Sequence, residues 1–180
     1  MDLQRSRPPA PFDHQPPRPD FTLSSDDLAN GEQIAMAHVY TGAGGDNVSP
    51  QLRWSGFPGD TRGFAVTVFD PDAPSPSGWW HWLLFGLPAA CTELPAGAGA
   101  GDGAQVLPDG AVMLRNDFGD HCYDGPAPPP GDHHHRYFFT VHALDTDELG
   151  LTGDEPPTVG GFQLAVHTLA RAHIMVTFAT

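Results

Sequence analysis

The 180-residue sequence has few basic residues and few cysteines. Only 8 lysine and arginine residues stand against 22 acidic residues, which gives a net charge of −14 with neutral histidines. A charge of this sign opposes non-specific binding to nucleic acid or to an anionic membrane, because both attract cationic proteins. The two cysteines, Cys91 and Cys122, are too few for a disulfide scaffold, and we expect both to be buried, reduced thiols.

Long apolar runs are also missing. No stretch approaches the roughly 20 apolar residues that a transmembrane helix needs, and the N-terminal residues lack the apolar segment of a signal peptide. We therefore expect a cytoplasmic protein without integral membrane association.

Glycine and proline are abundant, at 21 and 20 residues, but they alternate with aromatic and β-branched runs. This mixture favours a loop-rich β protein over a disordered one. Residues 1–20 are rich in proline and are expected to form an extended or disordered arm. Residues 21–180 are then expected to form a single domain, which is long enough to bury a sizeable core.

Apolar periodicity predicts several strands and one helix. Apolar spacing over residues 159–172 matches one face of a helix, whereas glycines and prolines oppose a second helix at 147–157. Strands are predicted at 21–25, 36–41, 64–69, 80–85, 112–114, 137–144 and 173–178. Many strands with one late helix favour a β-sandwich or Greek-key sheet with peripheral helices.

Two polar clusters lie at the ends of the strongest predicted strands. Asp70 and Asp72 follow the strand at 64–69, and His81 opens the next strand. A second cluster, residues 133–137, comes directly before the strand at 137–144. If these strands are neighbours, the clusters converge on one edge, where binding sites are commonly built from loops on a rigid scaffold.

The residue types leave several chemistries open. Histidines beside carboxylates, with the hydroxyl of Tyr137, suit a small anion or zwitterion, while Asp70 and Asp72 could instead form an acid–base pair. A metal site is a further alternative, although no HExxH or CxxC motif is present. The candidate metal ligands are the two aspartates and His81, His121, His133, His134 and His135. The acidic turn could also be purely structural, with His133 and His134 on a solvated loop tip.

Arg136 is expected to be structural. It follows His135 directly and could reach Asp70, Asp72 or backbone carbonyls, which would brace this edge of the sheet. The turn at residues 115–117 is expected to be architectural as well.

Several segments resemble the phosphatidylethanolamine-binding protein family, in particular its bacterial branch, whose members are also called Raf-kinase-inhibitor-like proteins. The resemblance covers about residues 21–178. The matching segments are Asp70-Pro71-Asp72-Ala73-Pro74, Trp80-His81-Trp82, His135-Arg136-Tyr137, Asn47-Val48-Ser49-Pro50, Arg115-Asn116-Asp117-Phe118-Gly119 and Pro128-Pro129-Pro130-Gly131.

This resemblance implies a mainly β fold with a large antiparallel Greek-key sheet packed on a smaller sheet and peripheral helices. It implies a binding or regulatory protein rather than an enzyme, with a small pocket for phosphate-like anions or phosphorylated head groups. It names no cofactor and no metal, and it leaves a kinase-inhibitor-like role, a protein partner and a homodimer open. The ligand-binding residues that it implies are Asp70, Asp72, Pro74, His81, His135 and Tyr137.

From these residue types we expect protonated His81 or His135 to donate hydrogen bonds to the anion. Asp70 and Asp72 would orient and charge the two imidazoles. Binding should then be tighter below about pH 6.5, the ordinary pKa of histidine. The less favoured alternative is a hydrolase, metal-dependent or carboxylate-based, that uses the same aspartates and histidines.

Overall fold

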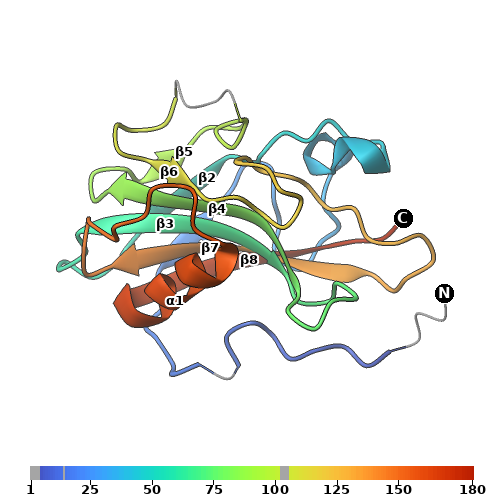
Figure 1. Ribbon diagram of the computed structural model, residues 1–180, viewed down its shortest axis with the longest axis horizontal. Helices are drawn as coiled ribbons and strands as arrows, with labels where there is room; N and C mark the ends of the chain where they lie inside the picture. The colour runs from blue at the N-terminus through green and yellow to red at the C-terminus, as the bar shows by residue number, and fades with distance from the viewer. Residues whose placement is uncertain (1–4, 14, 102–105) are drawn as a thin grey trace.

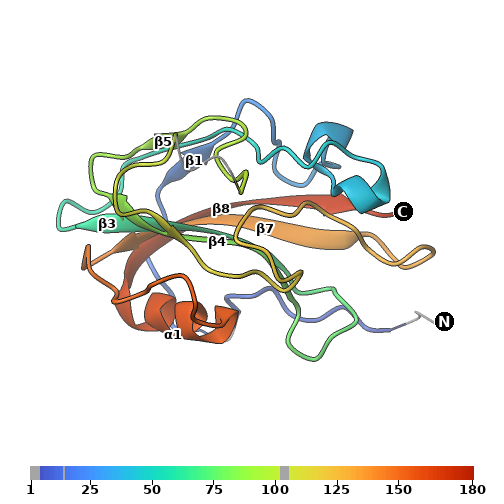
Figure 2. The same cartoon turned by 45° about the horizontal axis from the view of Figure 1, so that its top comes forward.

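A computed structural model describes residues 5–13, 15–101 and 106–180. Two antiparallel sheets pack face to face, as Figures 1 and 2 show. The larger sheet has the order β6-β4-β3-β7-β8 and the smaller has the order β1-β2-β5. The strands are β1 (Thr22–Ser24), β2 (Leu52–Ser55), β3 (Gly63–Asp70), β4 (Trp79–Pro88), β5 (Glu93–Leu94), β6 (Val112–Met113), β7 (His135–Leu144) and β8 (Thr168–Phe178).

The main core lies between the two sheets. Trp54 of the smaller sheet packs there with apolar side chains of the larger sheet, among them Phe64, Phe139 and Val141, and all four are at most 2% exposed. A smaller apolar cluster covers the opposite face of the larger sheet, beneath the helix α1 (Pro157–His167). Strand β3 is therefore buried on both faces, which explains its unbroken apolar sequence.

The predicted fold class is confirmed, but the C-terminal end of the predicted helix was wrong. The helix ends at His167, and residues 168–172 begin β8. Ala170 and Ala172 alternate with more exposed neighbours and pair with Ala143 and Val141 of β7. Strand pairing overrides the helical spacing of these residues, since small side chains at every second position suit a strand buried on one face.

The exposed face of α1 also differs from the prediction. Phe162 and Val166 are two of the apolar residues whose spacing predicted this helix and its buried face. They are 67% and 51% exposed, whereas Gly160 and Leu164 are buried. Gly160 allows this close packing, because a Cβ at that position would lie 2.7 Å from the Leu114 side chain.

The strand predicted at 36–41 was wrong as well. Two short 3₁₀ helices, η1 (Met36–His38) and η2 (Thr41–Ala43), occupy this segment. Their backbone groups bond to the following loop: the N–H of Asn47 donates to Val39 O at 2.8 Å, and that of Val48 donates to Ala37 O at 2.9 Å. Local turns thus satisfy these groups without a sheet partner.

The N-terminal arm runs along the outer face of the larger sheet (Figure 2). The N–H of Arg171 in β8 donates to Pro19 O at 3.1 Å, and the Arg171 guanidinium lies 4.1 Å from the centre of the Phe12 ring. The described part of the arm therefore has fixed contacts with the domain. Within the described ranges, no helix is long and apolar enough to cross a membrane.

Candidate anion pocket

A small cavity of about 210 Å³ lies where β3 ends and where β4 and β7 begin. Because both neighbours of β3 run antiparallel to it, these three strand ends meet at one edge of the sheet. The predicted convergence of the two clusters is thus observed. Five of the six predicted residues line the cavity; they are Asp70, Pro74, His81, His135 and Tyr137.

His135 lies between the carboxylates of Asp70 and Asp132. Its Nδ1 is 2.7 Å from Asp70 Oδ2 and its Nε2 is 3.0 Å from Asp132 Oδ2. Burial disfavours the charged ring, but the hydrogen bonds and charges of Asp70 and Asp132 outweigh it, so the pKa of His135 is raised. Both ring nitrogens of His135 face carboxylate oxygens, which can only accept hydrogen bonds, so the arrangement favours the protonated ring.

Asp72, the sixth predicted residue, pairs with Arg136 instead of a histidine. The guanidinium Nε donates to Asp72 Oδ2 at 2.7 Å, and Nη2 donates to Oδ1 at 2.8 Å. Burial alone would raise the pKa of Asp72, but these hydrogen bonds from Arg136 lower it. Arg136 therefore braces this edge of the sheet as predicted, while Asp72 fixes the loop after β3.

His81 is held by a backbone carbonyl rather than by an aspartate side chain. Its Nδ1 lies 2.7 Å from the carbonyl oxygen of Asp124. A carbonyl can only accept, so Nδ1 carries the proton and Nε2 is left with a free lone pair. Burial lowers the pKa of His81 despite the nearby charge of Asp70. The ring is neutral near pH 7 and offers an acceptor rather than a donor.

Tyr137 supplies the donor. Its ring lies between those of His81 and His135, with centroid distances of 5.2 and 6.4 Å. The hydroxyl is buried and has no hydrogen-bond partner among the described residues. Burial raises the pKa of Tyr137 well above its ordinary value, so the O–H stays protonated and is free to donate to a bound group.

The family model for phosphatidylethanolamine-binding protein matches residues 24–179. The chain belongs to the phosphatidylethanolamine-binding protein family. Among curated relatives, the UPF0098 proteins YbhB and YbcL of Escherichia coli are each 46% identical to it, over 87% and 86% of this chain and 99% and 85% of their own lengths.

Solved structures agree with this assignment. The crystal structure of Escherichia coli YbcL, described as a new member of the mammalian PEBP family, has a TM-score of 0.86 at 44% identity, and the match covers 89% of this chain and 99% of that one. A putative phosphatidylethanolamine-binding protein homologue from Chlamydia trachomatis has a TM-score of 0.73 at 28% identity, over 89% and 98% of the two chains. Membership in the phosphatidylethanolamine-binding protein family supports a binding-type protein.

Sequence reasoning missed Asp124 and gave no individual role to Asn47 or Asn116, the residues that hold this cavity in place. Asn116 Nδ2 donates to Asp124 Oδ2 at 2.7 Å, and Asn47 Nδ2 donates to Oδ1 of the same carboxylate at 3.1 Å. The Asn116 Oδ1 accepts three backbone N–H groups from Phe118, Gly119 and Asp120. The turn at 115–117 was expected to be architectural, and Asn116 is its centre. Asp124 lies in a non-regular stretch without a pattern that marks it.

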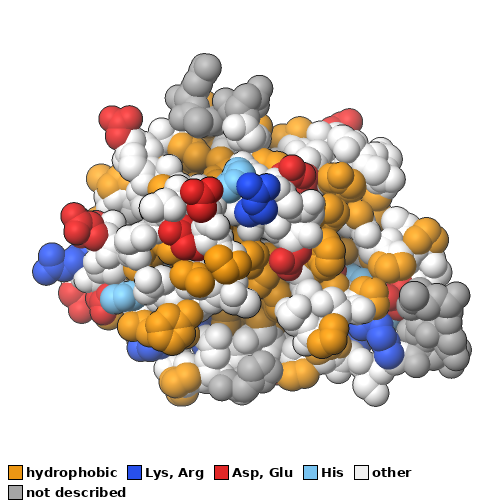
Figure 3. All heavy atoms as spheres, viewed as in Figure 1, with side chains coloured by type: hydrophobic (Ala, Val, Ile, Leu, Met, Phe, Trp, Pro, Cys, Tyr) orange, Lys and Arg blue, Asp and Glu red, His pale blue; other side chains and the backbone are white. Residues whose placement is uncertain are grey.

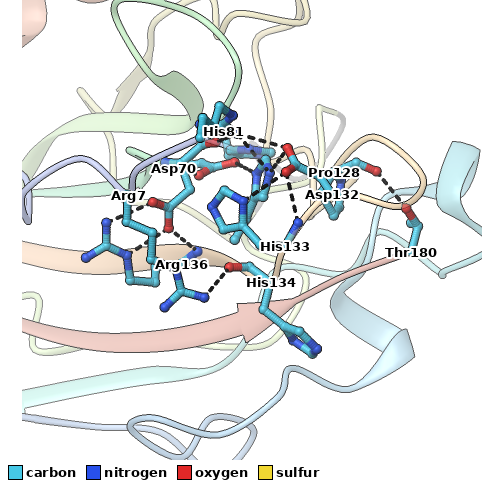
Figure 4. A network of polar contacts seen from close by, with 12 residues as sticks. Arg7, Asp70, His81, Pro128, Asp132, His133, His134, Arg136 and Thr180 are labelled. Carbon is cyan, nitrogen blue, oxygen red and sulfur yellow. Dashed lines mark hydrogen bonds and ion pairs between the residues drawn. The ribbon is translucent and has the colours of Figure 1, made fainter. Parts of the chain in front are cut away.

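Aromatic and proline residues form the apolar walls of the cavity. Phe118 contacts both Trp79 and His81, with centroid distances of 5.4 Å in each case. Pro128 and Pro129 form the opposite wall. The Pro128 carbonyl also accepts a hydrogen bond from the Thr180 hydroxyl at 2.8 Å (Figure 4). These rigid side chains restrict the size of any group that can enter the cavity.

The remaining histidines differ in their relation to the pocket. His133 lies beside Asp132, with its Nδ1 2.9 Å from Asp132 Oδ1, and its side chain is only 23% exposed. His134 is exposed, and its carbonyl accepts from Arg7 at 3.0 Å. His121 bonds the Met113 carbonyl at 2.9 Å and does not line the cavity. The loop-tip interpretation thus fits the exposure of His134 better than that of His133.

A second, larger cavity of about 450 Å³ lies on the outer face of the sheet, between the arm and α1. Its walls include Phe12, Trp80 and Leu164, and one histidine, His142, lies at its edge. Burial, with the charge of Arg171, lowers the pKa of His142 to about 3, so this ring is neutral. The smaller cavity therefore remains the better candidate for a charged ligand.

Proposed function

We propose that the small pocket binds a phosphate-like head group that carries one proton, and that the protein is a non-catalytic binding or regulatory protein. One observation carries the proposal: a donor, the Tyr137 hydroxyl, and an acceptor, His81 Nε2, belong to the same cavity, and neither has a partner among the described residues. A monoprotonated phosphate has both complementary groups. Its P–OH donates to His81, and a charged oxygen accepts from Tyr137.

The charges around the pocket favour a monoanion over a dianion. Asp70 and Asp132 face the His135 imidazolium, and Asp72 faces Arg136. With Arg5, which lies 2.9 Å from Asp132 Oδ2, three cations face these three carboxylates, so no unbalanced positive charge remains for a second negative charge on the ligand. On the face shown in Figure 3, basic side chains lie singly among acidic ones, so local donors rather than the overall field must hold the anion.

The same pairing opposes the hydrolase alternative that uses Asp70 and Asp72 as acid and base. The Arg136 guanidinium lowers the pKa of Asp72, which disfavours its role as a proton donor near neutral pH. The Asp70 carboxylate is occupied by His135 and by the N–H of Asp72, at 2.7 Å in both cases. A regulatory role would act through a protein partner, which the resemblance to Raf-kinase-inhibitor-like proteins leaves open.

The pH dependence should follow the proton of the ligand. Phosphate monoesters lose their second proton near pH 6. Above that pH the bound P–OH disappears and two acceptors, His81 Nε2 and a phosphate oxygen, face each other. Binding of O-phosphorylethanolamine should therefore weaken from pH 5.5 to pH 8. The sequence analysis also expected tighter binding at lower pH. Here, however, the titrating proton belongs to the ligand rather than to a histidine.

NMR titration of O-phosphorylethanolamine at pH 5.5 and 8 tests the proposal. We expect Tyr137→Phe and His81→Phe each to weaken binding about tenfold or more at pH 5.5. The exposed His134→Ala is the matched control and should bind as the wild type does. Sulfate, an anion of similar shape that carries no proton at these pH values, should bind much more weakly than the phosphate ester. Equal affinity for sulfate, or unchanged binding in both pocket variants, would contradict the assignment.

A further inference from the structure

A group of three metal-ligating side chains lies beside the anion pocket. The ligand atoms of Asp132, His133 and His135 are all within 4.8 Å of one another. Asp132 Oδ2 is 3.0 Å from His135 Nε2, and Asp132 Oδ1 is 2.9 Å from His133 Nδ1. Asp132 and His135 are buried, and the His133 Nε2 is buried with no partner among the described residues.

The ring of His135 is already oriented as metal-bound histidines usually are. A ligating imidazole commonly donates its second N–H to a carboxylate, which fixes the ring and makes the ligating nitrogen more basic. Here the Nδ1 of His135 faces Asp70 Oδ2 at 2.7 Å, so its Nε2 points toward Asp132.

A cationic side chain lies close to two of these ligand atoms. Arg5 of the N-terminal arm places its Nη2 2.9 Å from Asp132 Oδ2 and 3.5 Å from His135 Nε2. The same nitrogen donates to the carbonyl oxygen of Asp72. The arm is also fixed by Arg136, whose Nη2 donates to Pro8 O at 2.7 Å. Arg5 is an independent indication that this position holds a positive charge.

We propose that Asp132, His133 and His135 bind a divalent transition-metal ion, and that Arg5 fills this site when the ion is absent. Two imidazoles and one carboxylate form a ligand set that suits zinc, cobalt or nickel better than magnesium or calcium, which prefer oxygen ligands. Replacement of Arg5 by the ion leaves the charge of the site unchanged, because the divalent ion takes the place of two single positive charges, the guanidinium and the proton on His135 Nε2. Binding of the ion releases Arg5 and with it the adjoining part of the arm.

The metal site is separate from the proposed anion contacts. His135 borders both, but the phosphate proposal depends on Tyr137 and His81, which the metal does not need. Tyr137→Phe should therefore leave metal affinity unchanged while it weakens phosphate binding. The two proposals can fail independently.

Titration of the full, tag-free chain with Co²⁺ and Zn²⁺ tests the site, with Co²⁺ absorption as a reporter of low coordination number and calorimetry for affinity. We expect His133→Ala to weaken Zn²⁺ binding at least tenfold. Arg5→Gln should strengthen it severalfold, because the competing cation is removed. The adjacent, exposed His134→Ala should bind as the wild type does. These three positions are at least partly exposed, so the variants should fold.

The opposite pattern would overturn the proposal. If His134→Ala weakens binding as much as His133→Ala, the metal is bound adventitiously by the histidine run. If Arg5→Gln binds no more tightly than the wild type, Arg5 does not compete for this site. An absence of binding by the wild type at micromolar Zn²⁺, with no gain in Arg5→Gln, would also overturn it.

Discussion

Asp72 and Arg136 form a two-point ion pair that joins the loop after β3 to the beginning of β7. The guanidinium contacts both carboxylate oxygens, at 2.7 and 2.8 Å, and the backbone N–H of Arg136 adds a third hydrogen bond at 2.9 Å. The Asp72 side chain is fully buried. Strands β3 and β7, which both carry pocket residues, are therefore fixed relative to each other by a largely buried charge pair, in which the Arg136 side chain is 17% exposed.

Removal of one partner of this pair should be costly. We expect Arg136→Met to lower the free energy of unfolding by about 3–5 kcal/mol, because it leaves a buried carboxylate without its counter-charge. The double variant Arg136→Met/Asp72→Asn should recover part of the loss. Chemical denaturation at pH 7 measures both. Arg53→Met is the control, since Arg53 is 51% exposed in its ion pairs and should cost at most about 1 kcal/mol. Equal losses at the two arginines would contradict the prediction.

The unpartnered hydroxyl of Tyr137 predicts opposite effects on stability and binding. Tyr137→Phe should raise the free energy of unfolding by about 1 kcal/mol, because a buried O–H that has no partner among the described residues is removed, while phosphate binding is weakened. Tyr123→Phe provides the matched control. The Tyr123 hydroxyl donates to His38 O at 2.6 Å in an equally buried position, so its removal should destabilise by about 1 kcal/mol. A loss of stability in Tyr137→Phe would show that its hydroxyl is already satisfied.

Asn116 should be a structural determinant of the pocket. Its side chain makes six hydrogen bonds, three donated and three accepted. We expect Asn116→Ala to cost about 3 kcal/mol or more, since Asp124 and three backbone N–H groups lose a partner. It should also weaken phosphate binding, because the turn places Phe118 against His81. Asn30→Ala, which removes one exposed hydrogen bond to the N–H of Met175, should cost less than about 1 kcal/mol.

His142 should make the protein sensitive to mild acid. Its pKa is lowered to about 3 in the folded chain, by burial and by the charges of Arg171 and His173, against about 6.5 when unfolded. The unfolded chain therefore binds one more proton between these values. The His142 contribution is fully present above pH 6.5 and falls by up to about 1.4 kcal/mol per pH unit as the pH drops from there toward 3.

Unfolding measured at pH 7.5, 6 and 5 in the wild type and in His142→Gln tests this. The Gln variant should be less stable at pH 7.5, because the contacts with Thr67 and Thr168 change. Its stability should fall less steeply with acid. The exposed His134→Gln should keep the wild-type slope, and a wild-type slope in His142→Gln would refute the assignment.

The convergence of the predicted residues on one cavity could be predicted, because these residues follow local rules. Asp70, His81 and His135 lie at strand ends, and antiparallel pairing brings those ends together. Arg136 lies next to His135 in the chain, so its position near Asp72 could also be predicted from the sequence.

Other contacts depend on long-range packing and could not be predicted. Arg5 reaches Asp132 across 127 residues, and the sequence of a proline-rich arm does not show where it docks. Asp124 holds His81 through its backbone carbonyl, an atom that every residue has. The helix boundary failed for a different reason. The apolar spacing of residues 168–172 suits a helix as well as a strand, and pairing with β7 makes this segment a strand.

The proline wall of the cavity affects which experiments can detect a ligand. Proline has no amide hydrogen, so Pro128 and Pro129 give no signal in amide-detected NMR or in hydrogen exchange. Contact of a ligand with these two prolines would therefore give no amide signal in either method. The ring protons of His81, together with the indole N–H of Trp79, which has no partner among the described residues, are better probes of occupancy.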